Sequence, residues 1–132
     1  MILCNGAALD SFSNRCRYAT LSTAEAELYA LVLIIRRLLC FPCMIAFVIG
    51  YSLPPTPVHE DNKAMCEMLE RRDLSARSRH VRVNIGFIGD AVNAGEIALV
   101  WTPTQEQVAD NLTAAEDRVR HMRNRDIMLG GA

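Results

Sequence analysis

Three acidic residues occupy positions from which their carboxylates could converge on a metal ion: Glu27, Asp61 and Asp110. Glu27 falls in the first turns of a predicted helix, Asp61 at the end of a predicted strand, and Asp110 in the first turns of the last predicted helix. Carboxylates at such places can meet at one rim of a sheet, where they repel one another unless divalent cations bridge them. Oxygen ligands of this kind suit Mg²⁺ or Mn²⁺, and two such ions about 3.5–4 Å apart can promote phosphodiester cleavage.

Glu25 and Glu27 lie in the same segment but have different expected roles. Ser22 and Glu25 have the spacing of a capping box, in which the serine caps the helix and the glutamate reaches back to a free backbone amide. Glu27 has no such role, and helical periodicity puts it on a stripe of leucine and isoleucine residues that we expect to face the core. A carboxylate there must be paired, protonated or bound to a metal; the alternative is a partly exposed glutamate at the stripe's edge.

The other two acids also have structural alternatives. Asp61, followed by Asn62, could cap a helix that begins at Lys63. Asp110 could be a favourable charge near a helix N-terminus. Spacing alone therefore leaves the metal site as one hypothesis among these.

The composition is that of one ordinary domain of 132 residues, with 51% hydrophobic and 22% charged residues. A formal net charge of −1 gives no general attraction to nucleic acid, so any such contact must use a local patch. The densest basic cluster runs over residues 71–82. It could bind a nucleic-acid backbone, or it could be a solvated basic loop.

Sequence periodicity predicts an α/β domain in which a mixed sheet is flanked by helices. Residues 80–94 fit either an alternating strand or a helix, and their length and the following Gly95 favour the helix. Strands are expected within 1–12, at 58–60 and at 97–101, and Asn5-Gly6 is expected to form a hairpin turn. Helices are expected at 23–39, around 63–69, at 80–94 and from 104 onward.

Four blocks of the chain, in order and in register, resemble the ribonuclease H domain of copia-type LTR-retrotransposon polyproteins. They are LSTAEAELYAL (21–31), PTPVHEDNKA (55–64), SRHVRVNIGFI (78–88) and GEIALVWTPTQEQVADNLT (95–113). The family's corresponding segments read SSTEAEY, PTPIYCDNQAA, SRTKHIDIRYHFI and GEIELEYVPTEDQLADILTK. The resemblance covers about residues 4–113.

This resemblance implies a ribonuclease H-like fold that cuts the RNA strand of an RNA–DNA hybrid with two Mg²⁺ or Mn²⁺ ions. The family's acidic ligands fall on Glu27, Asp61 and Asp110. The implied partners are the hybrid and an upstream reverse transcriptase segment of the same polyprotein, and the implied nucleic-acid contacts are Asn62, Arg77, Arg79 and His80.

The chain departs from the family at its N-terminus, because the family begins with a strand that bears a first aspartate. Asp10 aligns with the third strand and is not a substitute. We therefore expect an N-terminally truncated domain over residues 1–113, with the first strand missing, followed by a charged helix or tail over 114–132. Its nuclease activity would be impaired; the alternative is a non-catalytic remnant that acts as a binding or structural α/β domain.

Five cysteines and no signal peptide favour a reduced intracellular protein (cytoplasm, virus-like particle or nucleus) that is not secreted. Cys40 and Cys43 have the spacing of a redox or zinc pair, but we expect buried thiols. Residues 38–51 are strongly apolar, and we interpret them as a buried helix end. The alternative is a membrane hairpin, but we expect no membrane partner. Trp101 is expected in the core.

Overall fold

A computed structural model of the chain describes residues 1–4, 7–11, 23–71, 79–109 and 117–130. The chain divides into two compact units. One comprises Met1–Arg15 with Pro103–Ala132, and the other comprises Cys16–Thr102. The units are described separately below, and the larger one contains most of the predicted site residues.

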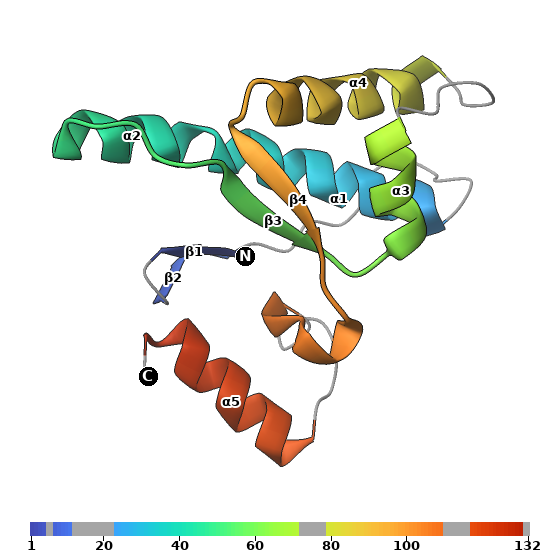
Figure 1. The fold of residues 1–132 in the computed structure, drawn as a ribbon. Coiled ribbons are helices and arrows are strands. Elements are labelled where there is room, and N and C mark those ends of the chain that lie inside the picture. Colours follow the sequence, from blue (N-terminus) through green and yellow to red (C-terminus); the bar gives the residue numbers. More distant parts are fainter. Residues whose placement is uncertain (5–6, 12–22, 72–78, 110–116, 131–132) are drawn as a thin grey trace. The chain divides into compact units, whose positions relative to one another are not determined.

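The larger unit contains a parallel pair of strands, β3 (Thr56–Glu60) and β4 (Ile97–Trp101), with Val58 opposite Leu99 (Figure 1). Parallel neighbours need a long crossover connection. Here the crossover consists of α3 (Lys63–Arg71) and α4 (Arg79–Asn93), which contact each other and β4. The predicted strands at 58–60 and 97–101 and the predicted helices at 63–69 and 80–94 are confirmed.

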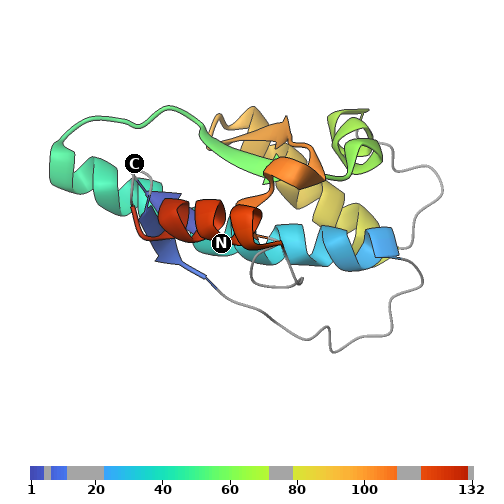
Figure 2. The same cartoon turned by 90° about the horizontal axis from the view of Figure 1, so that it is seen from below.

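The core of this unit is formed largely where α1 (Thr23–Leu38) packs on α4, and the two helices lie side by side (Figure 2). From α1, the buried side chains are Leu28, Leu31, Val32, Ile35 and Leu38; from α4, they include Val81, Ile85 and Ile88. This spacing of three and four residues buries one stripe of each helix. Gly95, with φ of 70°, follows α4 in the left-handed conformation that the sequence led us to expect at its end.

Directly after α1, α2 (Cys40–Ile49) continues with only Leu39 between the two helices. Pro42 lies in the first turn of α2, where a proline is tolerated. No residue of α2 is buried, so the prediction of a buried helix end is wrong for this helix. Among the described residues, Thr23–Ile49 is the one helical stretch long and apolar enough to cross a membrane by length and composition alone.

The smaller unit contains an antiparallel pair, β1 (Ile2–Cys4) and β2 (Ala7–Asp10), as predicted. Its predicted turn at Asn5-Gly6 lies outside the described residues. The predicted helix after Thr104 begins as a 3-10 turn, η1 (Thr104–Glu106), and residues 110–116 lie outside the described part of the chain.

The last helix, α5 (Arg118–Met128), begins at a well-formed cap. Oδ1 of Asp117 accepts the backbone N–H groups of Val119 and Arg120 at 2.9 and 3.0 Å. The Arg120 guanidinium donates to the carbonyl of Thr104 at 2.6 Å, which connects α5 to η1.

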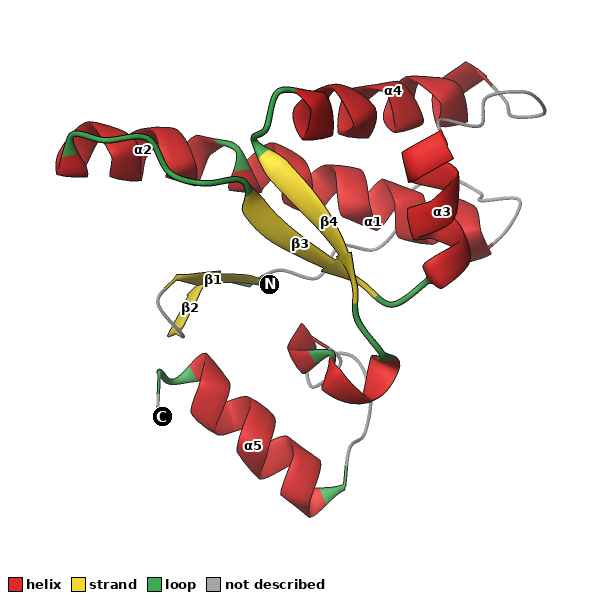
Figure 3. Ribbon diagram, viewed as in Figure 1, coloured by secondary structure: helices red, strands yellow, loops and turns green. Residues whose placement is uncertain are grey.

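The chain is therefore a mixed α/β protein. In its described part, the strands form two separate pairs, one antiparallel and one parallel, drawn in yellow in Figure 3.

Candidate functional site

Asn62 organises the junction between β3 and α3. Its side-chain Oδ1 accepts the backbone N–H of Met65 at 3.1 Å, and its carbonyl accepts those of Met65 and Cys66 at 3.0 and 3.1 Å. Asn62 thus caps α3, a role that asparagine fills well. The alternative role for Asp61, that of the helix cap, is wrong, because the next residue provides the cap.

Glu27 is brought to this junction from α1. The side-chain amide of Asn62 donates to Oε2 of Glu27 at 2.7 Å, across 35 positions of sequence. Glu27 is exposed, so its predicted place on the core-facing stripe is wrong and the alternative, a glutamate at the stripe's edge, holds. The buried stripe of α1 is centred one residue further on, through Leu28 and Ile35.

A third carboxyl group, that of Glu60, lies beside this pair and was not singled out from the sequence. Glu60 is the last residue of β3, is 9% exposed, and accepts the backbone N–H of Asn62 at 3.2 Å. The pKa of Glu60 is raised from 4.5 to about 7, chiefly by burial. The Asn62 N–H lowers this pKa, and the nearby charges of Asp61 and Glu27 and a hydrogen bond with Asp61 contribute to raising it.

The charges of Asp61 and Glu27 thus lie close enough to Glu60 to add to the effect of burial on its pKa. The signal in the sequence was the dyad Glu60-Asp61 at a strand end. It was missed because a strand-end glutamate is usually exposed.

Trp101 adds an aromatic group to the junction. Its indole N–H donates to the carbonyl of Asp61 at 3.1 Å, and the Lys63 ammonium lies 5.9 Å from the ring centroid. The residue is 49% exposed, so the prediction of a core tryptophan is wrong. A half-exposed ring with a cation against it, next to acidic residues, is suited to stacking on an unpaired base while the cation faces a phosphate.

The predicted basic contacts lie near the start of α4. Nε2 of His80 lies 2.5 Å from Oε1 of Glu25, a carboxylate whose side chain is only 11% exposed. His80 is therefore ion-paired whenever it is protonated. Arg79 is exposed, and Arg77 lies outside the described residues. The capping box that involves Ser22 is not tested, because Ser22 also lies outside the described part.

The donor chemistry of this junction fits Mg²⁺ or Mn²⁺, because the acidic side chains of Glu27, Glu60 and Asp61 offer hard oxygen ligands. Across the ranges that the structure describes, no group of three or more His, Cys, Asp or Glu residues has the arrangement of a metal site. Asp110 lies outside those ranges. The structure thus brings Glu27 to the junction that contains Asp61 and leaves the third predicted ligand untested.

The Cys40–Cys43 pair is the other predicted candidate for a metal or redox site. Both thiols are free and exposed, so the prediction of buried thiols is wrong for them, whereas Cys66 is buried. Burial also raises the pKa of the Cys66 thiol, with a contribution from the charge of Glu60. The exposed pair belongs to α2.

Comparison with known protein families finds no family model that matches the chain. No solved structure matches it either.

Proposed function

We propose that this chain is a ribonuclease H-like domain of a copia-type retrotransposon polyprotein, which binds an RNA–DNA hybrid and uses Mg²⁺ or Mn²⁺ to cut the RNA strand. The proposal rests on the four sequence blocks described above. One structural observation supports it most: the Asn62–Glu27 hydrogen bond joins two of those blocks at the carboxyl end of β3.

The position of this junction is suited to phosphodiester chemistry. In open α/β sheets, ligands bind outside the carboxyl ends of parallel strands. Asp61 follows the carboxyl end of β3, and Trp101 ends β4 beside it. A substrate placed there would meet acidic groups and an aromatic ring together.

Glu27 and Asp61 would hold the metal, together with Asp110 as the resemblance implies. A bound divalent ion supplies charge stabilisation and an activated water in phosphodiester cleavage. Asn62 fixes the orientation of Glu27 by donating to one oxygen, which leaves the other oxygen, Oε1, to bind a cation. Glu60 lies more deeply and would set the local charge through its protonation state.

The hybrid would be held by groups around this junction. Trp101 would pack against the sugar–phosphate backbone of the hybrid, and Lys63 would contact a phosphate beside it. Arg79 at the start of α4 would contact the backbone further along, with Arg77 and His80 as the resemblance implies.

A second candidate is a domain that binds the hybrid without cutting it. The specific observation in its favour is that the side-chain amide of Asn62 donates to Oε2 of Glu27, so this oxygen already has a partner within the chain. The two proposals predict the same binding and differ only in cleavage.

The test is incubation of the purified chain with a labelled RNA–DNA hybrid in Mg²⁺ or Mn²⁺, with RNA–RNA and DNA–DNA duplexes of the same sequence beside it. Glu27→Gln and Asp61→Asn should abolish hybrid-specific cutting, since each removes a charged ligand. The matched control is Glu67→Gln, an exposed acid of α3 that pairs only weakly with Arg71 at 3.8 Å, and it should cut normally.

Three outcomes separate the proposals. Hybrid-specific cutting that both site variants lose supports the nuclease. Tight hybrid binding without cutting supports the binding domain. Absence of any preference for the hybrid in a folded chain contradicts both.

A further inference from the structure

We propose that α2 and the turn after it, residues 40–53, insert into one leaflet of a lipid bilayer with anionic headgroups. These residues are called the apolar finger below. The inference goes beyond the proposed function, does not depend on it, and replaces the expectation of no membrane partner.

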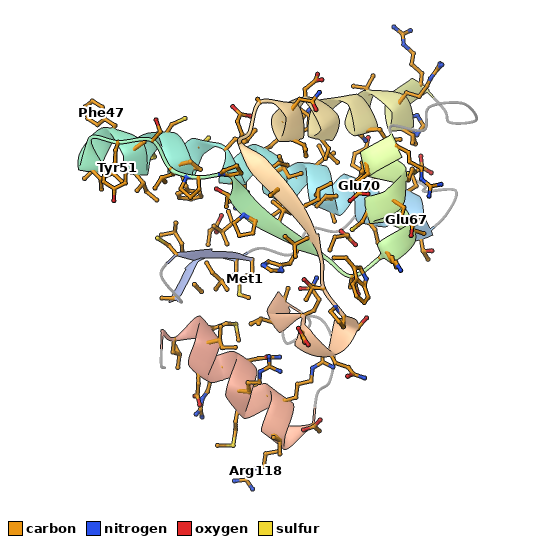
Figure 4. The ribbon with its side chains drawn as sticks, in the orientation of Figure 1. Met1, Phe47, Tyr51, Glu67, Glu70 and Arg118 are labelled. Atoms are coloured by element: carbon orange, nitrogen blue, oxygen red, sulfur yellow. The ribbon has the colours of Figure 1, made fainter. Side chains whose placement is uncertain are left out.

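The first observation is exposure. Phe47 is 90% exposed and Val48 is 81% exposed, and Met44 and Tyr51 are also exposed. Figure 4 shows Phe47 and Tyr51 near the far end of α2. A contiguous apolar surface of this kind marks an interaction site, because water otherwise meets it at a cost in free energy.

The second observation is that α2 has no polar side. Every residue from Cys40 to Ile49 is apolar, a cysteine or a proline, and none is buried. A helix on the surface of a protein in water normally turns a charged or polar face to the solvent. In α2 the half-buried residues are Phe41, Pro42, Ile45 and Ala46, and the others are exposed. The exposed apolar surface has no polar side to face water, and a lipid leaflet provides an apolar medium for it.

The third observation is the distribution of charge. Arg36 and Arg37 stand at the base of the finger, and no Asp, Glu, Lys or Arg follows until Glu60. The guanidinium of Arg36 lies 5.5 Å from the centroid of the Phe87 ring, so Arg36 contacts α4 at the base of the finger. Basic side chains next to an inserted apolar segment are attracted to anionic headgroups, which fixes the choice of lipid surface.

The length of the finger suits insertion without spanning. Ten helical residues measure about 15 Å, and the hydrocarbon core of a bilayer is about 30 Å thick, so α2 matches one leaflet. The preceding helix is not available to complete a span, because Leu28, Ile35 and others of its side chains are packed against α4.

The backbone of the finger is also suited to lipid. Gly50, with φ of 78°, ends α2 in the left-handed conformation, and its N–H donates to Ala46 at 2.8 Å. The chain then turns back toward β3 through Pro54 and Pro55 (Figure 1), which have no N–H groups to satisfy. These two prolines therefore add no backbone donor next to the finger.

A second copy of the chain is the other possible occupant. Pairing of two α2 helices would cover one side of each and leave the rest of its apolar surface in water. We therefore assign the finger to lipid.

The experiment is co-sedimentation of the full chain with vesicles of equal parts phosphatidylcholine and phosphatidylserine, with phosphatidylcholine vesicles alone for comparison. The double variant Phe47→Ser, Val48→Ser should weaken binding about tenfold or more, because two apolar side chains no longer enter the leaflet. The matched control is Val119→Ser, which changes an apolar residue of almost the same exposure, 79%, in α5 and should bind as the parent does.

A second readout places the finger in the bilayer. In a Trp101→Phe background, which removes the chain's single tryptophan, Phe47→Trp should give emission that shifts to the blue with vesicles and is quenched by brominated acyl chains. Circular dichroism of each variant checks that it is folded.

Either of two results would overturn the proposal. One is that the parent binds neither kind of vesicle, or that the double variant Phe47→Ser, Val48→Ser binds vesicles as tightly as the parent does. The other is that light scattering shows a dimer that the double variant loses, which would assign the finger to a second copy of the chain.

Discussion

Asn62 donates its side-chain amide to Oε2 of Glu27 at 2.7 Å, and through this bond the first turns of α1 are held to the start of α3. The same asparagine caps α3 with its Oδ1. One side chain thus stabilises a helix and aligns a carboxylate. The junction is consequently both a structural element and the candidate site.

Replacement of Asn62 by Ala should destabilise the larger unit. The cap and the bond to Glu27 are both lost, so we expect the free energy of unfolding to fall by about 1–2 kcal/mol. Urea unfolding followed by circular dichroism measures this change. Asn93→Ala, at the exposed end of α4, is the control and should change little. Equal stabilities for the two variants would remove Asn62 from its structural role.

Glu60 should make stability fall as the pH rises. The pKa of Glu60 is about 7 in the folded chain and 4.5 in the unfolded chain, so folding favours the protonated form of the carboxyl group. The contribution of Glu60 is greatest below pH 4.5, is lost as the pH rises from 4.5 to 7, and then stays constant. A shift of this size corresponds to a change on the order of 3 kcal/mol.

Glu60→Gln tests this dependence, since glutamine keeps an oxygen for the Asn62 N–H and does not ionise. Urea unfolding of the parent and the variant is measured at a series of pH values from about 4 to about 8, a range that includes both pKa values of Glu60. The difference between them should favour the variant increasingly above pH 4.5 and level off above 7. A difference that does not depend on pH would contradict the assignment.

The sequence predicted β3, β4, α3 and α4 well because local signals agree there. Residues 97–101 are a short, continuous apolar run that ends before Thr102-Pro103, and Gly95 stands where the chain must leave a helix. It also predicted that Asp61 and Asn62 occupy a strand-to-helix junction. The approach of Glu27 to that junction followed from the resemblance, not from periodicity.

The face of α1 was predicted wrongly for a definite reason. Residues 30–35 are all apolar, so no polar side defines which stripe is buried. Packing on α4 selects the stripe of Leu28 and Ile35, and Glu27 is left exposed. Likewise, α2 is apolar enough for a core, but a sequence does not reveal whether another element will cover it. Asp110 and Arg77 lie outside the described residues, so those predictions stay open.

Trp101 should report directly on nucleic acid at the junction. It is the single tryptophan, and its ring is half exposed beside Lys63. Addition of the hybrid should quench its fluorescence, and Trp101→Leu should weaken hybrid binding severalfold through loss of the ring's contact with the backbone. Tyr51→Leu, another exposed aromatic residue of the same unit, is the control. Unchanged fluorescence in a chain that binds the hybrid would exclude Trp101 from the interface.

The exposure of α2 predicts a contrast among the cysteines. Cys40 and Cys43 are exposed, whereas Cys66 is buried and has a raised pKa. Because the thiolate is the reactive form, iodoacetamide should modify Cys40 and Cys43 at least about tenfold faster than Cys66 in the folded chain. Mass spectrometry of the digested protein measures each rate. Equal protection of the three thiols would mean that α2 is covered.

The most direct test of the account is whether Glu27 and Asp61 together bind a divalent ion. Titration of the chain with Mn²⁺, followed by electron paramagnetic resonance of the free ion, measures this without requiring catalysis. We predict saturable binding that competes with Mg²⁺, is lost in Glu27→Gln and in Asp61→Asn, and persists in Glu67→Gln. Binding that is absent from the folded parent, or is the same in all three variants, would contradict the account.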